Sequence, residues 1–286
     1  MPSMQTNNTS NILIRPPIVA GTFYPDDPEE LKKTIEGFLD KAVVGKQKTN
    51  VKALILPHAG YVYSGPITGY GLKTLRHSSF DRVILLGPSH HFAFKGLVAA
   101  GEDYWETPLG KIKVLSKNDF PSIKNKEEII ESIEIHQPEH CLEVQLPFLQ
   151  MVLKDFQIFP LLTGEIEAQK AAKILMPLIE EETLIIASSD LSHYLPYSEA
   201  KMVDKVTIDA ILSNDIPRLN KYGEACGKKS IEILLHIAQQ KKWQPKLLCA
   251  MNSGETVSGI CSPKRILEQT DEVVGYASIA YYEPKK

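Results

Sequence analysis

The sequence has few cysteines, and they follow no recognisable pattern. Cys141, Cys226, Cys249 and Cys261 are widely spaced and form no Cys-x-x-Cys pair. They therefore make neither a disulfide framework nor a structural zinc knuckle. A reducing compartment fits best, and we predict a cytoplasmic protein.

Long hydrophobic runs are also absent. The polar start over residues 1–17 has no apolar segment like that of a secretory signal. No apolar run approaches the roughly 18 residues that span a bilayer, so we expect no membrane partner.

The chain also lacks an excess of charge of either sign. Its 32 basic and 35 acidic residues give a formal net charge of -3, so its overall field does not attract phosphate backbones and we expect no nucleic-acid partner. Hydrophobic residues make up 43% and charged residues 23%, as in an ordinary soluble globular protein. With 286 residues the chain can bury a large core.

The order of patterns predicts one α/β domain. Residues 1–14 are polar and are predicted to form a flexible tail, and no linker divides residues 15–286. Short apolar runs predict strands over 51–56, 82–86, 156–162, 184–187 and 273–282, the last closing the sheet, with further strands near 96–100 and 111–115. Helical patterns lie between them at 28–42, 66–77, 143–154, 167–181, 198–212 and 228–240. This alternation is typical of a mostly parallel central sheet flanked by helices.

Reactive side chains follow three of the predicted strands. His58 follows the first, His90 follows the second, and Asp190 and His193 follow the strand over 184–187. In an open α/β sheet the ligand crevice lies beyond the carboxyl ends of the strands. We therefore expect these residues to share one pocket, with Tyr63 in its wall.

A fourth element of the expected site is Cys226, in a glycine-bounded turn before the helix predicted at 228–240. Unpaired N–H groups at a helix N-terminus favour a thiolate, and Lys228 and Lys229 add positive charge. This thiol is predicted to be the most acidic of the four. Cys249 lies in an apolar run and is predicted to be an inert core residue.

Together, His58, His90 and Cys226 would supply three strong metal donors and leave coordination positions open, as a catalytic site requires. Iron(II), zinc and copper(I) accept nitrogen and sulfur ligands, whereas magnesium and calcium prefer oxygen. We therefore predict a transition-metal site, with His140 as a second residue of the pocket wall.

The ordered motifs Leu-Pro-His58-Ala-Gly, Gly-Pro-Ser-His90-His, Ser-Ser-Asp190-Leu-Ser-His193 and Ala-Cys226-Gly closely resemble the MEMO family (mediator of ErbB2-driven cell motility). The likeness runs from about residue 15 to the C-terminus. It implies a fold like that of the class III extradiol dioxygenases. It also implies that His58, His90 and Cys226 are metal ligands, with iron and copper both proposed, and that Asp190 and His193 are pocket residues.

The resemblance further implies partners, because bacterial and archaeal members are often encoded near a radical-SAM protein and an AMMECR1-like protein. Animal members are linked to phosphotyrosine-peptide binding. Class III dioxygenases usually hold iron(II) with two histidines and a carboxylate, whereas here the third ligand would be the thiolate of Cys226.

Three functions remain open on the sequence. The first is a non-haem iron(II) oxidoreductase in which His193 moves a proton, since an unperturbed imidazole with a pKa of about 6.5 suits that work. Asp190 would either orient His193 or join the metal as a weak fourth ligand. The second is a non-catalytic metal-binding or peptide-binding adaptor. The third is a hydrolase with Cys226 as nucleophile and a histidine as base.

Overall fold

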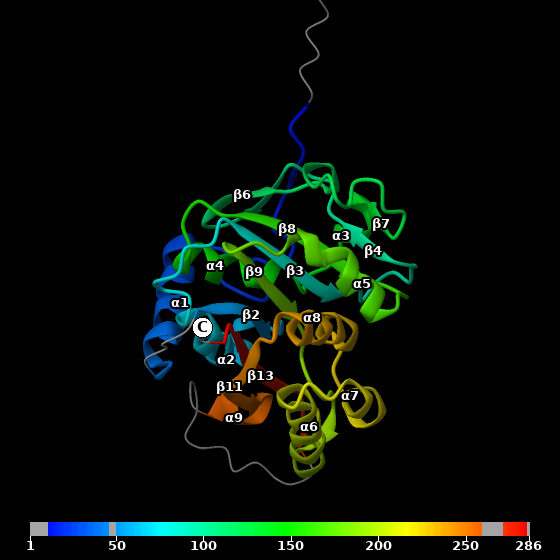
Figure 1. Cartoon of the computed structure of the whole chain (residues 1–286). Coiled ribbons are helices and arrows are strands. Elements are labelled where there is room, and N and C mark those ends of the chain that lie inside the picture. Colours follow the sequence, from blue (N-terminus) through cyan, green and yellow to red (C-terminus); the bar gives the residue numbers. More distant parts are fainter. Residues whose placement is uncertain (1–10, 46–49, 259–270, 285–286) are drawn as a thin grey trace, which may run out of the picture.

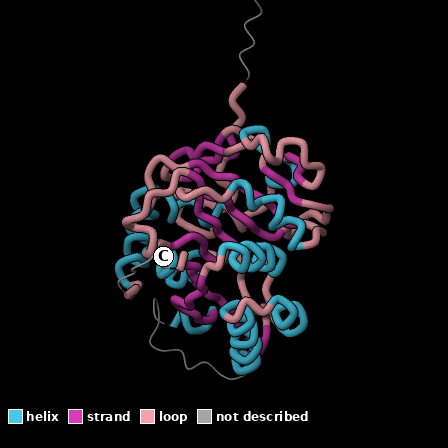
Figure 2. Tube along the Cα trace, in the orientation of Figure 1, coloured by secondary structure: helices cyan, strands magenta, loops and turns pink. Residues whose placement is uncertain are grey.

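A computed structural model describes residues 11–45, 50–258 and 271–284. A large sheet runs through these residues with helices packed on both faces (Figures 1 and 2). Its strands are β1 (Ile14–Arg15), β2 (Val51–Leu56), β3 (Arg82–Pro88), β4 (Leu97–Ala99), β5 (Tyr104–Thr107), β6 (Gly110–Val114), β7 (Ile129–Glu131), β8 (Gln157–Thr163), β9 (Thr183–Ser188), β11 (Gln244–Asn252) and β13 (Gly275–Tyr282). A separate small pair joins β10 (Leu195–Pro196) to β12 (Glu272–Val273).

The helices are α1 (Pro28–Lys41), α2 (Tyr61–Lys73), α3 (Ile133–His136), α4 (Leu146–Val152), α5 (Ala168–Leu175), α6 (Tyr197–Leu212), α7 (Ile216–Tyr222), α8 (Lys228–Lys241) and α9 (Ser253–Ser258). Short 3-10 turns cover Lys117–Asp119, Glu143–Gln145 and Met176–Leu178.

The centre of the sheet is parallel. Its order is β1-β5-β6-β8-β3-β9-β2-β13-β11, with β4 and β7 attached beside β8. The strands β8, β3, β9 and β2 run parallel to one another, whereas β13 pairs antiparallel with both β2 and β11. The predicted α/β class with a mostly parallel sheet flanked by helices is therefore confirmed.

Each central strand is buried on both faces, which is why it is continuously apolar. In β2, Ala53 and Ile55 join a core with residues of α5, α7 and α8. Leu54 and Leu56 join a second core with residues of α1, α2 and α4. Because successive side chains of a strand point to opposite faces, one apolar run supplies both cores.

The helix α1 matches its sequence signals, whereas α2 begins earlier than expected. Asp27 accepts hydrogen bonds from two backbone N–H groups at the start of α1, and the helix ends one residue before the predicted limit. The helix α2 starts at Tyr61 and runs through Pro66, where the prediction began. It can pack tightly on α1 because a Cβ atom at Gly65 would collide with the ring of Phe38.

Other boundaries differ for local reasons. The helix predicted at 167–181 becomes α5 and a 3-10 turn containing Pro177, whose ring cannot continue the helical hydrogen bonds. The flexible tail was predicted over 1–14, of which residues 1–10 lie outside the described ranges. Residue 14 is already in the sheet, paired with Tyr104.

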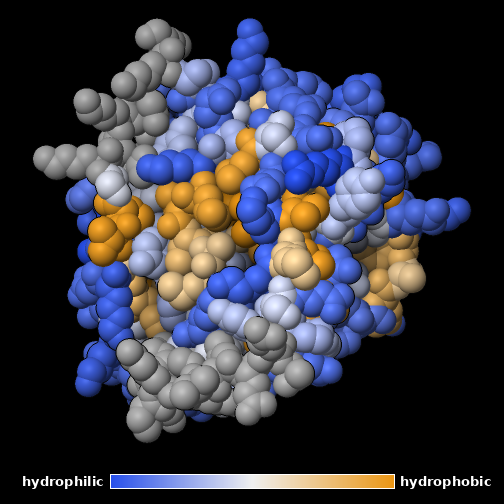
Figure 3. Space-filling view, turned by 90° about the horizontal axis from the view of Figure 1, so that it is seen from below, coloured by the Kyte–Doolittle hydropathy of each residue, from blue (hydrophilic) through white to orange (hydrophobic). Residues whose placement is uncertain are grey.

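The strand β11 forms one edge of the sheet, so β13 does not close it as predicted. Cys249 in β11 is only partly buried, so the prediction that it lies in the core is wrong. A cavity of about 330 Å³ lies between β11 and α6, lined in part by Leu247 and Met251. Figure 3 views the molecule from below Figure 1, where hydrophobic residues are interspersed with hydrophilic ones.

Within the described ranges, no helix combines the length and apolar character needed to cross a membrane.

Candidate metal centre

The carboxyl ends of three adjacent strands form the floor of the candidate site. The strand β9 lies between β2 and β3 in the sheet. His58, Asp190 and His90 each stand two residues beyond the end of β2, β9 and β3. The backbone N–H of His58 donates to Asp190 Oδ1 at 2.8 Å. The structure thus brings these residues to one edge of the sheet.

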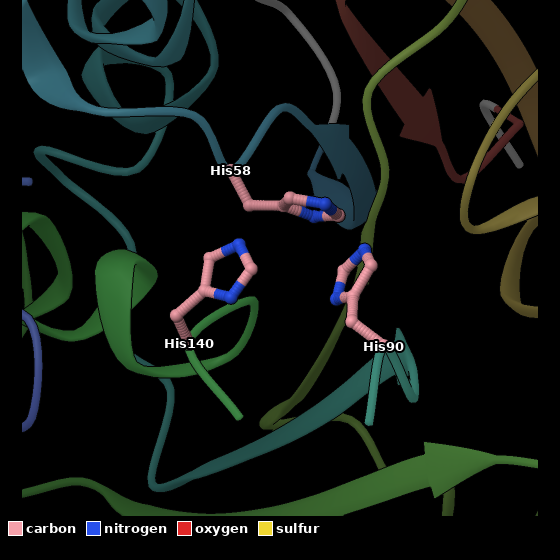
Figure 4. A group of neighbouring side chains, drawn as sticks. All are labelled: His58, His90 and His140. Carbon is pink, nitrogen blue, oxygen red and sulfur yellow. The ribbon is translucent and has the colours of Figure 1, made fainter. Parts of the chain in front are cut away.

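Three imidazole rings face one another above this floor (Figure 4). The ring centroid of His58 lies 5.3 Å from that of His90 and 5.6 Å from that of His140, and the His90 and His140 centroids are 4.9 Å apart. One ligand atom from each residue lies within 4.8 Å of the other two, and the group could hold a metal ion. His140, predicted in the pocket wall, therefore belongs to the cluster itself.

The cluster lies at the surface on one side. The His58 side chain is 2% exposed, whereas that of His90 is 32% exposed. Burial lowers the pKa of His58 to about 3 and that of His140 to about 4. Both rings are therefore neutral near pH 7, which is the form that binds a metal.

A buried carboxylate, Glu139, orients two of the histidines. Its oxygens accept from His90 Nδ1 at 3.0 Å and from the backbone N–H groups of His90, His140 and Cys141 at 2.7 to 3.0 Å. Its Oε1 also lies 3.3 Å from His140 Nδ1. Metal-binding histidines commonly donate their second ring N–H to a carboxylate in this way. Nε2 of His90 is thereby left free for a ligand.

Glu139 and His90 each favour the charged form of the other. Burial alone would raise the pKa of Glu139, but hydrogen bonds from the side chain and backbone of His90 and from the backbone of Cys141 hold the pKa well below its usual range. The hydrogen bond to Glu139 in turn raises the pKa of His90.

The N-terminal segment fixes the loop that carries Glu139. Arg15 Nη1 pairs with Glu143 Oε2 at 2.6 Å, and Nη2 donates to the carbonyl of Glu139 at 2.7 Å. The guanidinium lies 4.3 Å from the ring centre of Trp105, and Glu143 also accepts from Tyr24. Since both charged side chains are at most 2% exposed, this network is part of the core beneath the histidines.

Cys226 lies beside His58. Its Sγ is 3.2 Å from His58 Nε2 and accepts the backbone N–H of Asp190, also at 3.2 Å. The turn fits closely against β9, because a Cβ atom at Gly227 would lie 2.5 Å from the carbonyl oxygen of Ser188. Among the described residues, neither candidate metal group includes Cys226.

The prediction that Cys226 is the most acidic thiol is wrong. Burial, with a smaller effect of the neighbouring Asp190, raises its pKa to about 12, whereas the pKa of Cys249 is raised to about 11. Lys229 does not offset burial, since its ammonium group pairs with Glu232 at 2.7 Å. Without a bound metal, the Cys226 thiol is therefore protonated near pH 7.

Asp190 and His193 supply groups that can hold or move a proton. Burial raises the pKa of Asp190 to about 6. Nδ1 of His193 lies 2.9 Å from the carbonyl oxygen of Leu191, which can only accept, so Nδ1 carries hydrogen and Nε2 is free. An electrostatic interaction with His193 lowers the pKa values of His58 and Asp190, which places His193 beside the site.

Tyr63 lies on α2 with 41% of its surface exposed. Burial, followed by the charge of Asp190 and then that of Tyr63, raises the pKa of Tyr276. Tyr276 thus lies near both residues, a neighbour that the sequence did not reveal.

A second group that could hold a metal ion consists of His90, Glu139 and Cys141. Its Glu139 and Cys141 atoms already make hydrogen bonds within the protein. The Cys141 thiol donates to the carbonyl of Pro88 at 3.2 Å, and the Glu139 oxygens accept several N–H groups. The group therefore serves as a hydrogen-bonded support for the histidines.

These features define an α/β protein with a histidine-rich site, able to hold a metal ion, at the carboxyl edge of its sheet. A family model described as "Memo-like protein" matches residues 15–280. The chain therefore belongs to the Memo-like family, and the resemblance read from its motifs is confirmed.

Relatives from archaea and bacteria support this assignment. A MEMO1 family protein of Archaeoglobus fulgidus is 33% identical over 282 residues, covering 94% of this chain and 99% of the relative. One of Thermoplasma volcanium is 35% identical over 279 residues, with 93% and 98% covered. One of Aquifex aeolicus is 38% identical over 207 residues, with 69% and 74% covered.

Proposed function

We propose that this protein is a non-haem iron(II) oxidoreductase that acts on a small organic substrate. The observation that carries the proposal is the convergence of ligand atoms from His58, His90 and His140 within 4.8 Å of one another. Nitrogen donors, with a cysteine sulfur adjoining them, suit iron(II) and also zinc or copper. The exposed side of His90 leaves room for a substrate to approach.

In this proposal His58 and His90 hold the metal, and either Cys226 or His140 adds a third donor. Bound iron(II) would supply a site for dioxygen and exchange electrons with the substrate. His193 gives or takes a proton through its free Nε2. Asp190, with a pKa of about 6, fixes the backbone of His58 and can hold a proton near neutrality.

Elemental analysis of protein purified without oxygen tests the metal. We expect iron near one equivalent in the wild type and strong loss in His58→Ala and His90→Ala. His77→Ala, which removes an exposed histidine outside the site, should retain the wild-type content. Equal metal content in all four proteins would refute the assignment of the ligands.

Oxygen uptake tests the reaction. Protein reconstituted anaerobically with iron(II) is mixed with a panel of catechols and related compounds, and we expect turnover that His193→Ala reduces by about 10²- to 10⁴-fold, the usual contribution of a general acid or base. Metal binding without turnover on any compound would instead favour the non-catalytic adaptor.

A second candidate function follows from the 3.2 Å contact between Cys226 Sγ and His58 Nε2. A cysteine–histidine pair can attack esters or amides. We rank it lower because burial raises the pKa of Cys226 to about 12, and the thiolate is the nucleophile. Rapid alkylation of Cys226 in metal-free protein, with loss of a hydrolysis that chelators do not affect, would reverse this order.

The radical-SAM and AMMECR1-like partners and the cytoplasmic location remain predictions from the sequence. Co-purification of either partner with tagged protein from the native cell is the direct measurement.

A further inference from the structure

The buried hydroxyl of Ser188, the last residue of β9, has three polar neighbours. Its Oγ lies 2.7 Å from the carbonyl oxygen of Cys141, 3.0 Å from Gln145 Nε2 and 3.0 Å from His58 Nδ1. A serine hydroxyl offers one hydrogen and two lone pairs. Its three contacts therefore use its full capacity, and each must have a definite direction.

Two of these directions follow from the chemistry of the partners. A carbonyl oxygen only accepts, so the Ser188 hydrogen points to Cys141. The amide nitrogen of Gln145 is identified by its other contact, at 2.9 Å from the carbonyl oxygen of Pro57, and its two hydrogens serve Pro57 and Ser188. Ser188 then has one lone pair left, and it faces His58 Nδ1.

His58 Nδ1 must therefore carry a hydrogen. An unprotonated Nδ1 would set two lone pairs against each other at 3.0 Å, or would draw the Ser188 hydrogen away from the buried carbonyl of Cys141. With the hydrogen on Nδ1, Nε2 carries the free lone pair. Cys226 Sγ lies 3.2 Å from this Nε2 atom.

We propose that Ser188 is a positioning residue that holds His58 in the Nδ1–H form and so keeps Nε2 ready to bind a metal ion. The metal-binding part of this inference rests on the proposed function, whereas the position of the hydrogen on His58 does not. Without Ser188, Nδ1–H would be buried without an acceptor. The alternative form, with hydrogen on Nε2, could then turn to Asp190 Oδ2, which lies 3.9 Å away.

The hydrogen position is tested in metal-free, ¹⁵N-histidine-labelled protein by long-range ¹H–¹⁵N correlation, with His58 assigned from the signals lost in His58→Gln. We expect a protonated Nδ1 and an unprotonated Nε2 in the wild type. A protonated Nε2 in the wild type would overturn the inference whatever the variants do.

The role of Ser188 is tested with Ser188→Ala, Ser188→Thr and a control, Ser278→Ala, which removes another buried hydroxyl that has no hydrogen-bond partner. In Ser188→Ala we expect Nε2 to become at least partly protonated and zinc affinity to fall about 10- to 100-fold. Ser188→Thr keeps the hydroxyl and should restore both, and Ser278→Ala should change neither.

The outcomes separate the two proposals. If Ser188→Ala keeps the wild-type tautomer and zinc affinity, Ser188 has no positioning role. If Ser188→Ala does not fold, a protonated Nε2 of His58 in the wild type or in Ser188→Thr would still overturn the inference. If the wild type shows the expected tautomer but binds no zinc or iron, the metal function fails and the tautomer assignment stands.

Discussion

Glu139→Gln changes one atom at the centre of the site and has a calculable effect. The glutamine keeps the shape of the side chain but puts an NH₂ group where a carboxylate oxygen accepts N–H groups. Oε2 accepts the backbone N–H of His90, whereas Oε1 accepts from His90 Nδ1 and from the N–H groups of His140 and Cys141. The less costly orientation places NH₂ at Oε2 and loses the bond to the His90 N–H.

That loss leaves a part-buried donor facing another donor, at a cost of about 1 kcal/mol, the lower end of the range for a buried donor. The bond to His90 Nδ1 also loses its charge, and we expect zinc affinity to fall about 10- to 100-fold. Because Glu139 raises the pKa of His90, that pKa should fall in the variant.

Denaturant unfolding, zinc titration and NMR titration of His90 measure the three effects. Glu134→Gln, at an exposed position on α3, is the matched control and should change none of them. Wild-type stability together with wild-type zinc affinity in Glu139→Gln would refute the view that Glu139 orients His90.

Three further changes test the surroundings of the site. Burial lowers the pKa of His136 to about 4. As pH drops from about 6.5 to 4, the unfolded chain binds a proton at this histidine before the folded chain does, so the free energy of unfolding should fall. His136→Gln should remove about 3 kcal/mol of that loss, at about 1.4 kcal/mol per pH unit. Arg15→Met leaves Glu143 buried without its partner and should cost about 3–5 kcal/mol of unfolding free energy. Gly227→Ala places a methyl group against the Ser188 carbonyl and should cost about 1–3 kcal/mol.

Each change has a control of the same chemistry. His77→Gln removes an exposed histidine and should leave the acid limb of the stability curve unchanged. Arg76→Met removes an arginine from a largely exposed ion pair and should cost much less unfolding free energy than Arg15→Met. Gly37→Ala adds a Cβ that meets nothing within 4 Å. A control that lost as much stability as its test variant would contradict the corresponding argument.

The strand-end residues could be predicted because their position follows from a local pattern. An apolar run predicts a buried parallel strand, and parallel strands present their carboxyl ends at one edge. His58, His90 and Asp190 follow from that rule without any knowledge of distant contacts.

The supports of the histidines could not be predicted in the same way. Glu139 and Gln145 lie on an irregular segment between β7 and α4, and the contact that fixes this segment comes from Arg15, 124 residues before Glu139. The available signal was a run of charged and polar residues among apolar ones at 139–146. Such a run indicates buried polar groups only once its partners are known.

The acidity of Cys226 was misjudged because the sequence does not show depth of burial. A helix N-terminus and nearby lysines favour a thiolate, but each contributes little beside the desolvation of a charge. Lys229 is moreover drawn to Glu232 on the same helix. The same burial keeps His58 neutral and able to bind a metal. Burial therefore favours the metal-binding form of His58 but disfavours the thiolate form of the adjacent Cys226.

That contrast provides a test of which residue would complete the proposed metal site. Near pH 7 Cys226 carries a proton that must leave before its sulfur can bind, since its pKa is raised to about 12, whereas His140, with a pKa of about 4, has none to lose. Zinc binding through Cys226 should release one proton more than binding through His140. Calorimetry in buffers of different ionisation enthalpy counts the released protons, and comparison with Cys226→Ala cancels any contribution from His90. A difference of about one proton assigns Cys226 as the third ligand. No difference, with affinity retained in Cys226→Ala, assigns His140.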